Sequence, residues 1–189
     1  MIRIGILGDI GSGKSFVAKS FDCPVFNADN EVGKLYKKNR KIFIKLNKSL
    51  PKHITHFPLK KKEVARAILA NKNNLRKIIK IIHPEIRKKM SIFLNKNKKS
   101  KLVILDIPLL LENKINKRKD ILIFVQSNRT EILKKLKKRQ NFNSKMMNRF
   151  RKIQLPLDYK RKKSKFIIKN NFTNRFIKKQ IKYILNQIY

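Results

Sequence analysis

Acidic residues are scarce in this 189-residue chain, since eleven Asp and Glu face fifty Lys and Arg and give a formal net charge of +39. Cysteine is almost absent as well. The single thiol, Cys23, excludes an internal disulfide and fits a reducing compartment, so we expect a cytoplasmic protein. No apolar run in the sequence approaches the roughly 18–20 residues that a membrane span needs, so we expect no membrane partner.

The excess of basic residues has two interpretations. Dense positive charge attracts phosphate backbones, as it does in nucleic-acid-binding proteins. Alternatively, it is compositional drift toward Lys, because the basic residues are spread along the chain rather than gathered in one tail or stripe. We favour the second interpretation and expect no specific nucleic-acid partner, although so strong a field still attracts anionic small molecules.

Short apolar runs alternate with helical patterns along the chain. Hydrophobic residues make up 41% of it, which is enough for a core. The runs predict strands at 2–7, 25–27, 102–105, 121–125 and 166–168, with helices at 14–21, 30–50, 61–70, 74–83, 85–95, 130–139 and 174–188. Pro84 is expected in the first turn of its helix, and Thr130 is a candidate N-cap. This alternation predicts an α/β fold with a parallel sheet of about five strands flanked by helices.

The spacing of these elements indicates a single domain, 1–189, with two additions. About 70 residues separate the second strand from the third, which is too long for an ordinary crossover and predicts an inserted helical subdomain at about 31–100. The polar, basic stretch at about 139–164 is either a mobile lid or a solvated helix pair. The core is expected at about 1–30, 101–138 and 165–189.

The segment Gly8–Ser15 reads G-D-I-G-S-G-K-S and fits the phosphate-binding pattern G-x-x-x-x-G-K-[ST] in full. A predicted strand precedes it and a predicted helix follows it, so backbone N–H groups and a helix N-terminus are expected to surround a phosphate. Lys14 is expected to reach the β- and γ-phosphates of a nucleotide, and the Ser15 hydroxyl to ligate Mg²⁺. A Gly-rich turn that merely packs would not explain Lys14 and Ser15 together. The predicted nucleotide-binding residues are Gly8, Asp9, Ile10, Gly11, Ser12, Gly13, Lys14, Ser15 and Phe16.

Three further positions are candidates for chemistry. Asp29 lies just beyond one predicted strand and Asp106 closes another, at the strand ends that line the active crevice of doubly wound sheets. An acid there can hold Mg²⁺ through water or accept a proton from a substrate hydroxyl; the alternative for each is a helix N-cap or a loop salt bridge. His83 directly precedes a proline, and a His in that setting is more often structural. Asp9 places a negative charge in a loop for anions, so we expect its side chain to point away from the phosphates.

With these residues placed, the sequence resembles the dephospho-CoA kinase family from the first strand to about Asn171. The loop Gly8–Ser15, Asn27–Asp29 and His83–Pro84 are similar to three of its motifs. The most discriminating match is Asp106–Glu112, D-I-P-L-L-L-E, which is similar to the family's D-x-P-L-L-x-E. Further matching positions are Lys135, Arg139, Gln154 and Asn170.

The resemblance implies phosphorylation of the ribose 3′-hydroxyl of dephospho-CoA, with ATP and Mg²⁺, by a P-loop core with a helical CoA-binding region and a lid. By position, Asp29 resembles the family's proposed base and Arg139 a lid arginine that faces phosphates; with Lys14 they are the expected catalytic residues. The expected acceptor-side residues are His83, Asp106, Pro108, Leu109, Leu110 and Glu112. We expect a monomer whose partner is this small-molecule substrate.

The chain departs from the family pattern at Asp9, Phe16, Asn27 and Lys135, where the family usually has Gly, Thr, Asp and Arg. Lys135 cannot form the planar fork of an arginine. Two other functions stay open at this point. One is another small P-loop kinase for a nucleoside, nucleotide or metabolite, against which the segment Pro108–Glu112 argues. The other is a basic nucleic-acid-binding module that retains a nucleotide fold.

Overall fold

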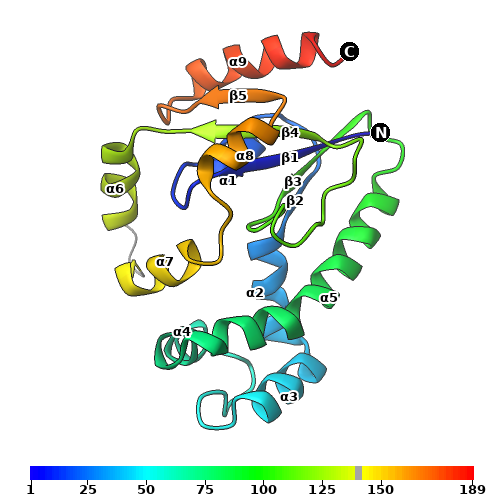
Figure 1. The fold of residues 1–189 in the computed structure, drawn as a ribbon. Helices are drawn as coiled ribbons and strands as arrows, with labels where there is room; N and C mark the ends of the chain where they lie inside the picture. The colour runs from blue at the N-terminus through cyan, green and yellow to red at the C-terminus, as the bar shows by residue number, and fades with distance from the viewer. Residues whose placement is uncertain (139–141) are drawn as a thin grey trace. The chain divides into compact units, whose positions relative to one another are not determined.

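The computed structural model describes residues 1–138 and 142–189, and in these residues five strands form one sheet (Figure 1). The strands are β1 (Ile2–Gly8), β2 (Val25–Asn27), β3 (Leu102–Asp106), β4 (Ile121–Gln126) and β5 (Phe166–Lys169). Their order is β2-β3-β1-β4-β5, and each neighbouring pair is parallel. The α/β prediction is confirmed, because continuous apolar runs are typical of parallel strands buried on both faces.

The helices agree with the sequence prediction in most places. They are α1 (Lys14–Lys19), α2 (Ala28–Lys38), α3 (Arg40–Ser49), α4 (Lys61–Ala70), α5 (Lys72–Lys96), α6 (Arg129–Lys137), α7 (Ser144–Arg151), α8 (Leu157–Lys163) and α9 (Asn174–Asn186). None of these described helices is long and apolar enough to cross a membrane.

The starts of α3 and α6 differ from the prediction. The single helix expected at 30–50 is divided at Asn39, whose backbone is extended and whose side chain accepts a hydrogen bond from Ile42 N at 3.0 Å, so that Asn39 caps α3. Thr130 is not the N-cap of α6. Asn128 takes that place, because its Oδ1 accepts from Thr130 N at 3.0 Å.

Pro84 does not begin a helix, because α5 runs through it without a break. An interior proline costs a helix about 3 kcal/mol by removing one hydrogen bond and crowding the preceding turn. The buried side chains of α5 continue on both sides of Pro84, at Leu75, Ile78, Ile82 and Ile86. Burying such side chains contributes about 1.5–3 kcal/mol each, so the apolar stripe outweighs the cost of the proline.

The described residues divide into two compact units. Unit 1 consists of Met1–Asn27, Leu94–Asn143 and Ile153–Tyr189 and contains the sheet. Unit 2 consists of Ala28–Phe93 and Ser144–Lys152 and is helical. The stretch that the sequence suggested as a lid or a helix pair thus contributes α7 to unit 2 and α8 to unit 1.

In unit 1, one face of the sheet packs against α1 and α9, and α9 runs along β5 (Figure 1). The buried side chains of this core include Ile4, Ile6, Val17, Ala18, Ile104, Ile123, Val125, Ile168, Ile177 and Ile181. Alternate residues of β1 face the other side of the sheet. There Gly5 lets Leu110 come so close that a Cβ on the glycine would lie 2.5 Å from Leu110 Cδ2. The loop after β3 is therefore seated directly on the central strand.

In unit 2, Arg149 ties α7 to α4. Its guanidinium donates to the carbonyl oxygens of Ile68 at 2.6 Å and Leu69 at 2.7 Å. Both carbonyls lie in the last turn of α4, where the helix itself has no N–H donor for them. Arg149 thus supplies a C-terminal cap from another helix.

Candidate active site

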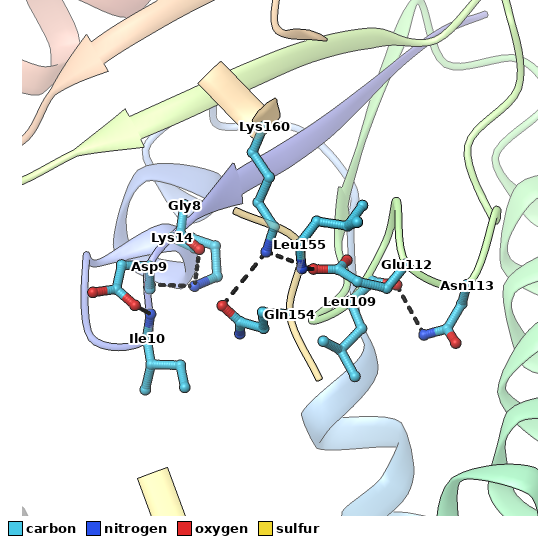
Figure 2. Close-up of polar contacts among 10 residues, drawn as sticks. All are labelled: Gly8, Asp9, Ile10, Lys14, Leu109, Glu112, Asn113, Gln154, Leu155 and Lys160. Carbon is cyan, nitrogen blue, oxygen red and sulfur yellow. Dashed lines mark hydrogen bonds and ion pairs between the residues drawn. The ribbon is translucent and has the colours of Figure 1, made fainter. Parts of the chain in front are cut away.

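The loop between β1 and α1 curls around its own lysine. Lys14 Nζ donates to the carbonyl oxygen of Asp9 at 2.7 Å and to that of Gly8 at 3.3 Å (Figure 2). Gly13, directly before α1, has a φ of +83°, which favours glycine, and a Cβ there would collide with the Asn170 side chain. The loop backbone thus holds an ammonium group at the site where the motif predicts phosphate.

Two side chains at the ends of neighbouring strands anchor this loop. Ser127, just after β4, and Asn170, just after β5, each donate to the carbonyl oxygen of Ser12 at 2.8 Å. Asn170 Oδ1 in turn accepts from Phe172 N at 2.8 Å. Ser12 and Asn170 are buried, so these bonds form away from water. Ser127 was not predicted from the sequence, although its place at the carboxyl end of a strand was a usable signal.

Asp9 uses its carboxylate within the loop. Its Oδ1 accepts from the backbone N–H of Ile10 at 2.7 Å (Figure 2). Its carbonyl oxygen also accepts from Ser12 N at 3.2 Å, in addition to Lys14. The side chain that departs from the family pattern thereby stabilises the turn of the loop, and its orientation toward bound phosphate stays a prediction.

Asp106 and Asn27 face each other across β2 and β3. They are partners in the strand register, and Asn27 Nδ2 donates to Asp106 Oδ2 at 2.5 Å. Asp106 is buried, and a buried carboxylate needs hydrogen-bond donors. An aspartate at position 27 would offer a second negative charge instead of a donor. The hydrogen bond to the buried Asp106 therefore explains why an asparagine suits position 27 in this chain.

The loop after β3 is tightly folded around Leu109. This residue has a φ of +61°, which is uncommon for a leucine and stores strain. Asn113 holds the strained turn, because its Nδ2 and its backbone N donate to the Leu109 carbonyl oxygen at 2.8 and 3.1 Å (Figure 2). Pro108, Leu109, Leu110 and Glu112, predicted for the acceptor side, all lie in this loop.

Glu112 joins the loop to the segment that leads into α8. Its Oε1 lies 2.7 Å from Lys160 Nζ and accepts from Leu155 N at 3.0 Å (Figure 2). Lys160 Nζ also donates to Gln154 Oε1 at 3.5 Å. Lys160 was not predicted, because nothing in the sequence separates it from the other basic residues of so basic a chain.

Asp29 lies in the first turn of α2, in unit 2, with an exposed side chain. A helix N-terminus favours a negative charge at that place. Burial, and then the nearby charge of Asp29, raise the pKa of Tyr36 to about 12. The charge of the Asp29 carboxylate therefore reaches Tyr36, which lies seven residues or two turns along the same face of α2.

His83 is half-buried in α5, also in unit 2. Burial, and then the neighbouring Arg87 guanidinium, lower the pKa of His83 from its ordinary value of 6.5. The imidazole is thus neutral at pH 7, with one nitrogen available as donor and the other as acceptor.

We expect Arg87→Gln to raise the pKa of His83 part of the way back toward 6.5, because burial, the larger cause, remains. Because the folded state disfavours the proton, the stability that His83 contributes is present above pH 6.5 and is lost as the pH falls through the lower folded-state pKa. NMR titration of the ring protons in both proteins measures the shift. An identical pKa in the variant would contradict the role given to Arg87.

Three other positions that the sequence singled out are Arg139, Lys135 and Cys23. Arg139 lies outside the described residues, as do 140–141. The Lys135 ammonium lies 5.2 Å from the centroid of the Phe172 ring, a cation–π contact. Burial, and then Asp22, raise the pKa of Cys23 to about 11, so its thiol is protonated at neutral pH and is a poor nucleophile. The described residues contain no cluster of three or more His, Cys, Asp or Glu that could hold a metal ion.

Comparison with known proteins shows the family to which this chain belongs. The model of the dephospho-CoA kinase family matches residues 2–175. The chain belongs to the dephospho-CoA kinase family. The resemblance based on Gly8–Ser15 and Asp106–Glu112 is thereby confirmed, and with it the assignment to the P-loop kinases, which use ATP.

Individual proteins are similar to this chain over nearly its whole length. The dephospho-CoA kinase of Wolbachia pipientis wMel is 31% identical over 190 residues, covering 98% of this chain and 97% of that protein. The crystal structure of TT1252 from Thermus thermophilus has a TM-score of 0.80 and 25% identity, covering 100% of this chain and 98% of that one. The dephospho-CoA kinase from Campylobacter jejuni shares the fold, with a TM-score of 0.62 at 20% identity over 98% of this chain and 96% of that one.

Proposed function

We propose that this dephospho-CoA kinase family member transfers the γ-phosphoryl group of ATP to the ribose 3′-hydroxyl of dephospho-CoA, with Mg²⁺. The observation that carries the proposal is the complete phosphate loop with Lys14 Nζ held at it, in a chain whose family model spans residues 2–175. The acceptor is a small molecule, and the protein acts as a monomer in the cytoplasm. The +39 charge attracts both anionic substrates without specific nucleic-acid binding.

Phosphoryl transfer leaves little covalent work to a protein, so positioning and charge neutralisation supply most of the acceleration. Lys14 and Arg139 offset negative charge on the transferring group. Asp29 accepts the proton of the ribose 3′-hydroxyl as its oxygen bonds to the γ-phosphorus and the bond to the β–γ bridging oxygen breaks, which leaves ADP.

Magnesium in kinases takes few protein ligands and is otherwise held by water and phosphate oxygens. The Ser15 hydroxyl, exposed in the first turn of α1, suits this donor set. When bound there, Mg²⁺ would supply further positive charge that offsets the charge of the triphosphate.

We assign the acceptor to the helical region at about 31–100 and to the loop after β3. His83 belongs to the first, whereas Asp106, Pro108, Leu109, Leu110 and Glu112 belong to or border the second. The remainder, at about 1–30, 101–138 and 165–189, forms the nucleotide-binding core, and about 139–164 the lid. Closing a lid over ATP excludes water and limits wasteful hydrolysis.

An acceptor panel tests the proposal. ADP release from Mg-ATP is measured with dephospho-CoA, a nucleoside mixture or shikimate as the sole acceptor. We expect stimulation by dephospho-CoA alone. Stimulation by another acceptor would instead support a different small P-loop kinase. Salt-sensitive binding of RNA with a structural preference, and no acceptor-dependent ADP release, would favour a nucleic-acid-binding module.

A further inference from the structure

A buried ion pair stands beside the loop after β3, and none of the steps above uses it. We call Glu112, Lys160, Gln154 and Leu155 the Glu112 node (Figure 2). The side chains of Lys160 and Glu112 are only 4% and 9% exposed. Lysine and glutamate are almost never this buried unless they are paired.

A buried ion pair of this kind does not by itself show that the pair stabilises the fold. Desolvating both charges is costly, and replacing a buried ion pair with apolar side chains is often neutral or stabilising. In this chain only eleven acids accompany fifty basic residues, so the burial of one of them with a lysine needs another account.

The node joins two segments that are far apart in the sequence. On one side is the strained loop after β3, with Leu109 at a φ of +61° and Leu110 seated on Gly5. On the other side is the segment at which the chain re-enters unit 1, at Ile153, two residues before Leu155. Glu112 Oε1 receives both the Lys160 ammonium and the Leu155 N–H, so one oxygen fixes the loop to the start of α8.

The other carboxylate oxygen is left without such a contact. Glu112 Oε2 is buried and has no hydrogen-bond partner among the described residues. A buried carboxylate oxygen that lacks a donor costs free energy until a donor reaches it. Since Oε1 is held by two donors, the carboxylate cannot turn to satisfy Oε2 without losing them. Oε2 is therefore held in place as an acceptor whose donor is missing from the described residues.

We propose that Lys160 is a positioning residue for the phosphoryl acceptor: it holds Glu112 Oε1 so that Oε2 accepts a hydrogen bond from dephospho-CoA. This inference rests on the proposed function and adds Lys160 to it as a residue that acts through Glu112. Lys160 itself touches neither substrate.

The test is a double-mutant cycle with Lys160→Met and Glu112→Gln, with KM measured separately for dephospho-CoA and ATP. Lys160→Met is expected to raise the KM for dephospho-CoA about 10–100-fold, the scale that a small misplacement of a binding group produces, and to leave the KM for ATP unchanged. Lys160→Arg, which keeps the charge, should restore most of the affinity. Lys162→Met, at an exposed position of the same helix, is the matched control.

The cycle keeps the inference decidable even where Lys160→Met alone does not fold, because the double variant leaves no unpaired buried charge. In the Glu112→Gln background, adding Lys160→Met should change the acceptor KM by less than about threefold, since both residues act through one contact. A larger, multiplicative effect overturns the inference, as does a folded Lys160→Met enzyme with a lower melting temperature but a wild-type acceptor KM. A wild-type enzyme that fails to phosphorylate dephospho-CoA overturns the proposed function together with this inference.

Discussion

Replacing Asp29 with Asn is expected to reduce kcat about 10²–10⁴-fold, the usual contribution of a general base, while the Kd for ATP stays near its wild-type value. The amide keeps the size of the carboxylate but cannot accept the ribose proton. Turnover is measured as acceptor-dependent ADP release and ATP binding by calorimetry.

The matched control for this variant is Glu31→Gln, a second carboxylate in the first turn of α2, paired with Lys34 at 2.6 Å. Both substitutions remove one negative charge from the same helix N-terminus, so both lose the same favourable interaction with the helix dipole. Only Asp29→Asn should lose turnover. Near-normal turnover in Asp29→Asn would show that the base assignment is wrong.

Lys14→Ala is expected to lower ATP affinity and kcat together, with kcat reduced about 10²–10³-fold, the scale for removing one preorganised donor from a transition state. Lys14 is the ammonium that the loop itself holds, through the carbonyl oxygens of Gly8 and Asp9. Its charge acts on the phosphates in the ground state and in the transition state, so both quantities fall.

Lys19→Ala, at an exposed position of the same helix, is the control for charge and helix propensity. Melting temperatures of both variants separate loss of function from loss of fold, because removal of Lys14 also deletes its hydrogen bonds to the carbonyl oxygens of Gly8 and Asp9. An unchanged rate in a folded Lys14→Ala protein would contradict the assignment of the phosphate loop.

The sheet was predictable because its signal is local. Each strand is a continuous apolar run, and such runs are typical of parallel strands covered on both faces. The helix boundaries were less predictable. Asn39 divides a periodic stretch because its side chain caps the second half, a local hydrogen bond that the apolar periodicity does not show. Pro84 is kept inside α5 by the buried stripe on both sides of it, where tertiary burial outweighs local propensity.

The candidate site likewise contains residues that the sequence identifies and residues that it does not. The loop Gly8–Ser15 and the segment Asp106–Glu112 carry their chemistry in contiguous residues, so the sequence identifies them. Ser127 and Lys160 act through partners distant in the chain, Ser12 and Glu112. In a sequence with fifty basic residues no pattern distinguishes Lys160, which is buried against a glutamate.

The most direct test of the account is the product formed from equimolar Mg-ATP and dephospho-CoA. After incubation with the enzyme, mass spectrometry and phosphorus NMR identify the product and the position of the new phosphate. We predict CoA, with one new phosphate on the ribose 3′-oxygen and one ADP for each CoA formed. ADP without a phosphorylated acceptor, or a phosphate at any other position, would contradict it.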